Sequence, residues 1–274
     1  MGSLSSGKQV APMHDIHIHT SLSSCARQNS ELSDYLGMFP RLGVSVAGFS
    51  NHLWDSAVPG ASEWYRSQNI EHLLVLKQQL KEASLPGVKF YFGCEVEYIG
   101  NGVISLHPEH AGIFDYVLAA PNHFHMVDFV RPSSISGGDE LNHLFASRFL
   151  DICGFDFVTG IAHPFFPMGF PGREAEILDR MPDPLLEECF RTAAGSGKSI
   201  EINISILCKL KACNALENYK RIMIIARDCG CRFHIGSDAH GMCHYTEERF
   251  LLGKTFADSC GIRLPEDPLK GPAS

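Results

Sequence analysis

The chain has 274 residues, of which 45% are hydrophobic, with a formal net charge of −8 and a pI near 5.9. The length suits a single α/β barrel, which often has about 250 residues, and the hydrophobic content argues against wholesale disorder. The acidic balance argues against a nucleic-acid interface built from bulk positive charge, whereas a small anionic substrate remains possible because bound metals supply local positive charge. Ten cysteines without a Cys-x-x-Cys pair, and no apolar run long enough to span a membrane, indicate reduced thiols in a cytoplasmic protein.

The first predicted element is a strand end at residues 15–19, where polar side chains alternate with isoleucines. His17 and His19 project from the same face of such a strand, and their Cα atoms lie roughly 7 Å apart at the usual rise per residue. Two imidazoles directed at one point can bind a divalent cation. Because many His-x-His pairs are surface accidents, the meaning of this pair depends on whether later strands bring further ligands.

Helices and strands alternate along the rest of the chain. The first half contains an expected helix at 31–42, a strand at 44–50, a helix at 69–83, and strands at 89–96 and 115–120. The second half contains a helix at 139–153, a strand at 155–162, a helix from Asp183, a strand at 198–204, a helix at 214–228, a strand at 232–236 and a last helix after Thr246. This alternation implies parallel strands with right-handed crossovers.

About seven such units without an internal linker favour one (β/α)7 barrel over an open doubly wound sheet. We expect residues 11–264 to form this single domain. A flexible lead-in at residues 1–10 and a loose tail at residues 265–274 are expected to flank it.

Side chains of the kinds that bind metals lie at the C-terminal ends of most of the predicted strands. They are His17, His19, His52, Glu95, His123, His163, Asp238 and His240. All lie at C-terminal strand ends, the face that carries the active site of parallel barrels. Any one of these histidines alone is more often structural, but eight ligand-type groups on one rim are hard to explain as core filling. Imidazole and carboxylate without thiolate pairs suit zinc, manganese or iron, and eight ligands indicate a cluster of two or three divalent metals bridged by Glu95 or Asp238.

An ordered series of motifs carries a family resemblance. The motifs are Asp15-Ile-His17-Ile-His19-Thr20, Asn51-His52, Gly93-Cys-Glu95, His123, Ala162-His163-Pro164 and Gly236-Ser-Asp238-Ala-His240. Over residues 13–245 the chain strongly resembles the polymerase and histidinol phosphatase (PHP) superfamily. The resemblance implies a distorted, TIM-like barrel of seven strands with a site of two or three metals that hydrolyses phosphate esters. It further implies one metal bound by His17, His19, Glu95 and Asp238, a second shared by Glu95 with His123 and His163, and a third served by His52 and His240.

Two positions depart from the family pattern. Cys25 stands in the loop where the family often has a histidine, and Asn51 stands where it usually has an aspartate. A cysteine can ligate zinc or iron as a thiolate, yet an isolated cysteine in such a loop is also commonly just packing, so two metals and three metals both remain open. An amide at Asn51 can still hold a ligand in place.

The resemblance predicts hydrolysis of a small phosphomonoester, such as histidinol phosphate or a nucleotide, by a hydroxide that the metals activate. Arg27, Arg131 and Arg173 lie in rim loops and are candidates for binding the phosphate, although loop arginines are more often solvated. His125 could act as the general acid for the leaving oxygen or simply face solvent. Asn203 could orient a ligand or make a core hydrogen bond.

Two other functions remain open. Related domains process nucleic-acid ends, so the chain could be an exonuclease or oligonucleotide phosphodiesterase. The absence of a basic stripe counts against long nucleic acid but not against a mononucleotide or short oligonucleotide. A non-catalytic metal-binding protein is disfavoured, since a scaffold has no physical need for converging imidazoles. The sequence leaves the oligomeric state open.

Overall fold

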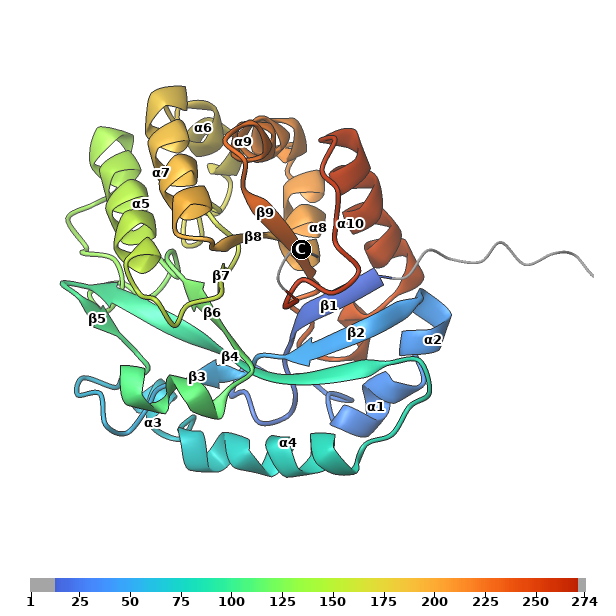
Figure 1. The fold of residues 1–274 in the computed structure, drawn as a ribbon. Coiled ribbons are helices and arrows are strands. Elements are labelled where there is room, and N and C mark those ends of the chain that lie inside the picture. The colour runs from blue at the N-terminus through green and yellow to red at the C-terminus, as the bar shows by residue number, and fades with distance from the viewer. Residues whose placement is uncertain (1–12, 271–274) are drawn as a thin grey trace, which may run out of the picture.

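The structure is a computed structural model that describes residues 13–270, in which a parallel sheet is wrapped into a barrel and surrounded by helices (Figure 1). Seven strands follow one another in the order β1, β2, β4, β6, β7, β8 and β9, each parallel to its neighbour. Their bounds are β1 Met13–Ile18, β2 Val44–Phe49, β4 Lys89–Gly100, β6 Tyr116–Ala120, β7 Gly160–Ile161, β8 Ser199–Asn203 and β9 Arg232–Gly236. Two short strands, β3 (His52–Leu53) and β5 (Val103–Ile104), pair with the C-terminal half of β4, parallel and antiparallel respectively.

The first and last strands of the barrel meet at their C-terminal ends. The backbone amide of Asp238 donates to the carbonyl of His17 at 2.7 Å, and that of His19 donates to the carbonyl of Ala239 at 2.9 Å. These bonds nearly close the sheet and bring the segments after β1 and β9 together. The predicted seven-stranded barrel is therefore confirmed, with its C-terminal strand ends gathered at one mouth.

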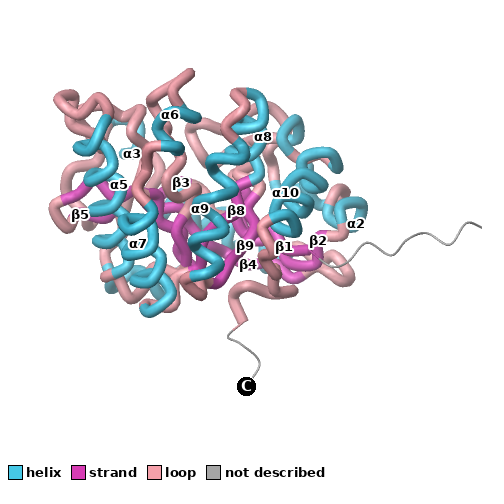
Figure 2. Tube along the Cα trace, turned by 90° about the horizontal axis from the view of Figure 1, so that it is seen from above, coloured by secondary structure: helices cyan, strands magenta, loops and turns pink. Residues whose placement is uncertain are grey.

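Helices cover the outside of the barrel, as the view from above shows (Figure 2). The α-helices are α1 Leu32–Leu36, α2 Phe39–Leu42, α3 Glu63–Arg66, α4 Ile70–Glu82, α5 Gly138–Cys153, α6 Glu174–Asp179, α7 Asp183–Gly195, α8 Ile204–Ala212, α9 Leu216–Asp228 and α10 Glu247–Ser259. Two 3-10 helices, η1 (Pro108–Ile113) and η2 (Met242–His244), lie in connecting segments. Each long helix turns an apolar stripe inward, as in α4, where Leu73, Leu76 and Leu80 are buried.

Two expected elements are interrupted. Residues 31–42 form α1 and α2 rather than one helix, because the chain turns at Gly37 and Pro40 has no backbone amide to continue the first helix. The expected strand at 155–162 pairs with its neighbours only over β7. Ahead of β7 the backbone amide of Val158 donates to the carbonyl of Phe155, so this segment turns before it reaches the sheet.

The strand expected at 198–204 ends earlier and is followed at once by a helix. The side chain of Asn203 accepts a hydrogen bond from the backbone amide of Ile206 at 2.9 Å, which caps the start of α8. The expected strand end at Ile204 is therefore wrong, because the apolar run after Asn203 is buried as one face of α8 rather than as sheet.

The C-terminal segment crosses the N-terminal end of the barrel. The His14 ring donates through Nδ1 to the carbonyl of Pro265 at 2.8 Å, and Asp267 accepts from the Tyr91 hydroxyl at 2.9 Å. These contacts hold the first residues of the segment expected to be loose, whereas the expected lead-in at 1–10 lies outside the described residues. Within residues 13–270, no helix combines the length and the apolar character needed to cross a membrane.

Candidate metal centre

Glu95 on β4 lies at the middle of the barrel mouth, where five imidazoles surround its buried carboxylate. From Oε2 the distances are 3.0 Å to His52 Nδ1, 3.4 Å to His17 Nε2 and 3.5 Å to His19 Nε2; from Oε1 they are 3.0 Å to His163 Nε2 and 3.8 Å to His123 Nε2. Burial raises the pKa of Glu95, but electrostatic interactions with His52 and His17 and hydrogen bonds from His163 and His17 outweigh burial and hold the pKa well below its usual range. Each oxygen of one ionised carboxylate thus faces its own group of imidazoles.

Asp238 closes the side of the mouth next to β9. Its Oδ1 lies 3.4 Å from His19 Nε2 and 3.4 Å from His240 Nδ1. The backbone of Asp238 has a φ of 50°, and His163 has a φ of 32°. Non-glycine residues rarely adopt this left-handed region, and such strain is often kept where function fixes a side chain. Both strained residues belong to the set that the strand-end pattern singles out.

Three groups of donors come close enough to hold a cation. Within each, the ligand atoms lie within 4.8 Å of one another: His17, His19 and Glu95; Glu95, His123 and His163; and His19, Cys25, His52 and His240. Together with Asp238, all eight residues at the predicted strand ends therefore converge on one site. Nitrogen and carboxylate donors in groups of three or four fit zinc, manganese or iron.

Most of these imidazoles are held from behind by a second polar group. The contacts are His17 Nδ1 to Glu201 Oε1 at 2.6 Å, His123 Nδ1 to Glu97 Oε2 at 2.5 Å, His163 Nδ1 to Asn122 Oδ1 at 3.0 Å and His19 Nδ1 to Ser23 Oγ at 3.0 Å. An acceptor at Nδ1 fixes the proton there and leaves the Nε2 lone pair free to bind a metal. Glu97 and Glu201 have buried side chains whose function in the site the strand-end pattern does not reveal.

Asn51 takes part in this outer layer. Its Oδ1 accepts from the Ser23 hydroxyl at 2.8 Å and from the backbone amide of Thr20 at 2.7 Å. Because the Ser23 proton is given to Asn51, the Ser23 oxygen is free to accept from Nδ1 of His19. The amide of Asn51 thus helps to hold His19 in place through Ser23.

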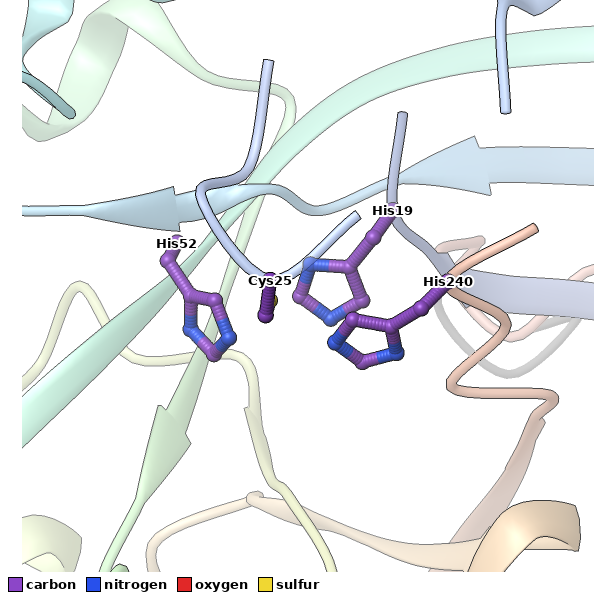
Figure 3. Close-up of side chains that lie close together, drawn as sticks. All are labelled: His19, Cys25, His52 and His240. Atoms are coloured by element: carbon purple, nitrogen blue, oxygen red, sulfur yellow. The ribbon is translucent and has the colours of Figure 1, made fainter. Parts of the chain in front are cut away.

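Cys25 lies among the imidazoles of the third group (Figure 3). Burial alone would raise the pKa of the Cys25 thiol. Hydrogen bonds with His240 and His52 have the opposite and larger effect, so that the pKa is lowered from 9.0 to about 6. A cysteine with such a pKa is largely a thiolate at neutral pH, the form that binds zinc or iron. The loop after β1 thus brings a soft donor to the group formed by His19, His52 and His240.

A cavity of about 550 Å³ opens above the centre. Its walls include Trp64 and Tyr65 of α3, and Lys209 of α8. Lys209 was not among the predicted substrate-binding residues, because nearly all of α8 lies between the predicted strand at 198–204 and the predicted helix at 214–228, where no element was expected. His125 also lines the cavity, where burial and the charge of His123 lower its pKa to about 4, so that its ring is neutral at pH 7.

The three candidate arginines do not line this cavity in the described part of the chain. Arg131 Nε donates to the carbonyl of Phe124 at 3.0 Å, and its guanidinium stacks on the ring of Phe170. Arg173 Nη1 donates to the carbonyl of Ser136 at 2.8 Å. Arg27 contacts the metal centre through its backbone, since its amide donates a hydrogen bond to the carbonyl of His240 at 2.6 Å. Phosphate binding by these side chains stays a prediction that requires Arg131 and Arg173 to leave their present partners.

No protein-family model matches this sequence, and no curated protein matches it. Solved structures do match. One is a histidinol phosphate phosphatase from Lactococcus lactis subsp. lactis Il1403, complexed with zinc, L-histidinol and phosphate; the TM-score is 0.63 and the identity 16%, over 92% of this chain and 95% of that one. Another is a candidate histidinol phosphatase from Listeria monocytogenes, with a TM-score of 0.65 and 14% identity over 85% of this chain and 97% of that one. The chain therefore shares the barrel fold of the histidinol phosphatases over nearly its whole length.

Proposed function

We propose that the chain is a metal-dependent phosphatase that hydrolyses a small phosphomonoester at the mouth of the barrel. The observation that carries this proposal is the position of Glu95, whose two carboxylate oxygens face separate groups of imidazoles. A carboxylate in that position can bridge two cations. The fold shared with a histidinol phosphate phosphatase complexed with zinc and phosphate supports the same class of chemistry.

The proposed ligands form three groups. His17, His19, Glu95 and Asp238 would hold one cation, and Glu95, His123 and His163 would hold a second. Cys25, His52 and His240 would hold a third, for which zinc or iron suits the thiolate. Divalent cations bound there would lower the pKa of a coordinated water and neutralise charge on the phosphoryl oxygens.

Other side chains would position these ligands and the substrate. Glu201 and Glu97 keep the rings of His17 and His123 oriented, which fixes where their Nε2 atoms point. Lys209, at the wall of the cavity, supplies an ammonium group that can pair with a phosphate oxygen. We expect Lys209→Met to raise KM for a phosphomonoester about 3- to 30-fold with a smaller effect on kcat, as loss of a charge-assisted hydrogen bond would. Lys254→Met, at an exposed lysine of α10, is the matched control.

A small substrate fits this site better than a nucleic-acid strand. The cavity has a volume typical of small-molecule sites, and among the residues described Lys209 is the only lysine or arginine that lines it. A protein that follows a nucleic-acid backbone needs a row of cations, whereas this chain has a net charge of −8. An exonuclease or oligonucleotide phosphodiesterase is therefore the second candidate.

A substrate panel tests the proposal. Purified protein loaded with manganese, zinc or iron is offered p-nitrophenyl phosphate, L-histidinol phosphate, nucleoside monophosphates and a short oligonucleotide. We expect hydrolysis of monoesters that stops in chelator and falls at least a hundredfold in His17→Ala. Failure to hydrolyse any phosphate ester, or parent-like activity in His17→Ala, would overturn the proposal. Preference for the oligonucleotide would favour the second candidate.

A further inference from the structure

The cavity above Glu95 changes character from its floor to its walls. The floor is formed by the polar residues of the metal centre, whereas the walls carry large apolar side chains. The large apolar side chains of the walls include Trp64, Tyr65, Met126, Phe129 and Met168. Aromatic rings and methionine sulfur atoms make favourable contacts with the faces and edges of another ring.

Trp64 is the most informative of these side chains. Trp64 is 40% exposed, although large apolar side chains are usually buried, and it lines the cavity. Its ring meets that of His52 edge to face, with centroids 5.3 Å apart, and that of Tyr65 in the same manner at 4.6 Å. An exposed ring that touches a proposed metal ligand is placed to contact whatever group the phosphate carries.

The wall is fixed relative to the metal centre. The Tyr65 hydroxyl donates to Glu97 Oε2 at 2.8 Å, the same oxygen that accepts from Nδ1 of His123. The ring of Phe129 packs against Tyr65 with centroids 6.2 Å apart. The aromatic wall and the imidazoles thus share one buried carboxylate, so that a ring bound at the wall sits at a set position relative to the centre.

Charge further limits what the wall can accept. Among residues 13–270, the carboxylates that line the cavity are Glu95 and Asp238, and both face the imidazoles of the centre. The remaining charged side chain of the lining outside the centre is Lys209. A leaving group that carries an ammonium, as L-histidinol does, would meet a like charge and no free carboxylate.

We propose that the substrate of this site is a phosphomonoester whose leaving group is an uncharged aromatic ring system, an inference that rests on the phosphatase function proposed above. The ring lies between Trp64 and the side of the cavity formed by Met126, Phe129 and Met168, while the phosphate lies at the floor. The volume of about 550 Å³ accommodates a phosphate with one ring system.

Calorimetry with phosphonates tests the preference for an aromatic ring by binding alone. Phosphonates have no ester leaving group, so differences in the reactivity of leaving groups do not affect the result. The metal-loaded protein is titrated with phenylphosphonate, propylphosphonate and 2-aminoethylphosphonate. We expect phenylphosphonate to bind about tenfold more tightly than propylphosphonate, and 2-aminoethylphosphonate to bind most weakly. Similar affinities for all three would overturn the inference, as would tighter binding of the ammonium compound.

Variants at Trp64 test whether the preference for phenylphosphonate over propylphosphonate depends on the aromatic wall of the cavity. Trp64→Ala should lose most of the tenfold preference for phenylphosphonate and keep its affinity for propylphosphonate, whereas Trp64→Phe should keep the preference. Leu251→Ala, at an exposed leucine of α10, is the control for losing an apolar surface side chain. Metal content is measured in each variant, because Trp64 touches His52. An unchanged preference in Trp64→Ala with full metal content would overturn the inference.

The two proposals fail in different ways. Hydrolysis of p-nitrophenyl phosphate with equal phosphonate affinities would overturn the aromatic preference and leave the phosphatase standing. A protein that prefers phenylphosphonate but hydrolyses no phosphate ester would overturn the phosphatase, and with it the assignment of the ring as a leaving group.

Discussion

Replacing Glu201 with glutamine should weaken metal binding without removing any proposed ligand. Glu201 is fully buried, and its Oε1 accepts a hydrogen bond from His17 Nδ1 at 2.6 Å. Its Oε2 accepts from the backbone amide of His163 at 2.6 Å and from Nδ2 of Asn203 at 3.0 Å. Glutamine has one acceptor oxygen, so in either orientation at least one of these donors faces an N–H group instead.

The expected loss follows from what that carboxylate does. Removing the partner that orients a metal-binding histidine typically lowers metal affinity about 10- to 100-fold, which corresponds to about 1.4–2.8 kcal/mol. A buried donor left without an acceptor also lowers the free energy of unfolding, by about 1–3 kcal/mol. The substitution should therefore reduce metal affinity and stability together while leaving the fold intact.

Titration calorimetry of the metal-free protein with zinc or manganese measures the affinity, and urea denaturation measures the stability. Glu176→Gln is the matched control, since Glu176 pairs with Arg173 and Arg180 on the surface and should bind metal like the parent. A folded Glu201→Gln protein with parent-like affinity would refute the view that Glu201 orients His17.

Three further predictions concern the mouth, its rim and the opposite end of the barrel. Cys25→Ala should lose about one equivalent of bound metal by elemental analysis and Cys25→His should retain it; an unchanged ratio in Cys25→Ala would exclude the thiolate as a ligand. Gly169→Ala should lower the free energy of unfolding by about 1–3 kcal/mol more than Gly172→Ala in urea denaturation. Both glycines have positive φ, but an added Cβ at Gly169 would lie 2.7 Å from the backbone nitrogen of His125, whereas at Gly172 it meets nothing within 4 Å; equal losses would refute this. Burial lowers the pKa of His14 from 6.5 to about 4. The free energy of unfolding of the metal-free protein should therefore fall as the pH falls from 6.5 towards 4, by up to about 1.4 kcal/mol per pH unit. His14→Gln should make this pH dependence weaker.

The sign of the His14 effect follows from its hydrogen bonds. The ring accepts from the backbone amide of Ile235 through Nε2 and donates to the carbonyl of Pro265 through Nδ1, so both nitrogens are used by the neutral form. As the pH falls, His14 is protonated near pH 6.5 in the unfolded chain but only near pH 4 in the folded chain, so acid favours the unfolded chain. A glutamine can make the same two bonds without titrating, so a slope equal to that of the parent would contradict this account.

The convergence of the eight strand-end residues could be predicted from sequence because parallel strands bring their C-terminal ends to one mouth. Knowing that His17, Glu95 and Asp238 lie at the ends of different strands is then enough to predict that they come together. The predicted positions of these residues hold even where the predicted length of a strand is wrong. β7 is far shorter than expected, yet His163, which follows it, still lies in the mouth of the barrel.

What the sequence could not reveal depends on the local path of the chain. Glu201 looks like an ordinary strand residue until the pairing of β8 with β9 brings its carboxylate beneath His17. Lys209 reaches the cavity because the chain turns into α8 at Asn203, whereas residues 205–213 had no predicted helix or strand that would direct this side chain. Trp64 lies on a one-turn helix within a long connection, and no periodicity marks its direction.

Glu95 is proposed to bridge two cations. Crystals grown with manganese or zinc, with anomalous scattering recorded at the absorption edge of the metal, would locate these cations. If Glu95 bridges them, we expect at least two anomalous peaks at the barrel mouth, one within bonding distance of each Glu95 carboxylate oxygen, and fewer peaks in a Glu95→Gln protein. A single peak, or peaks that Glu95 does not contact, would contradict it.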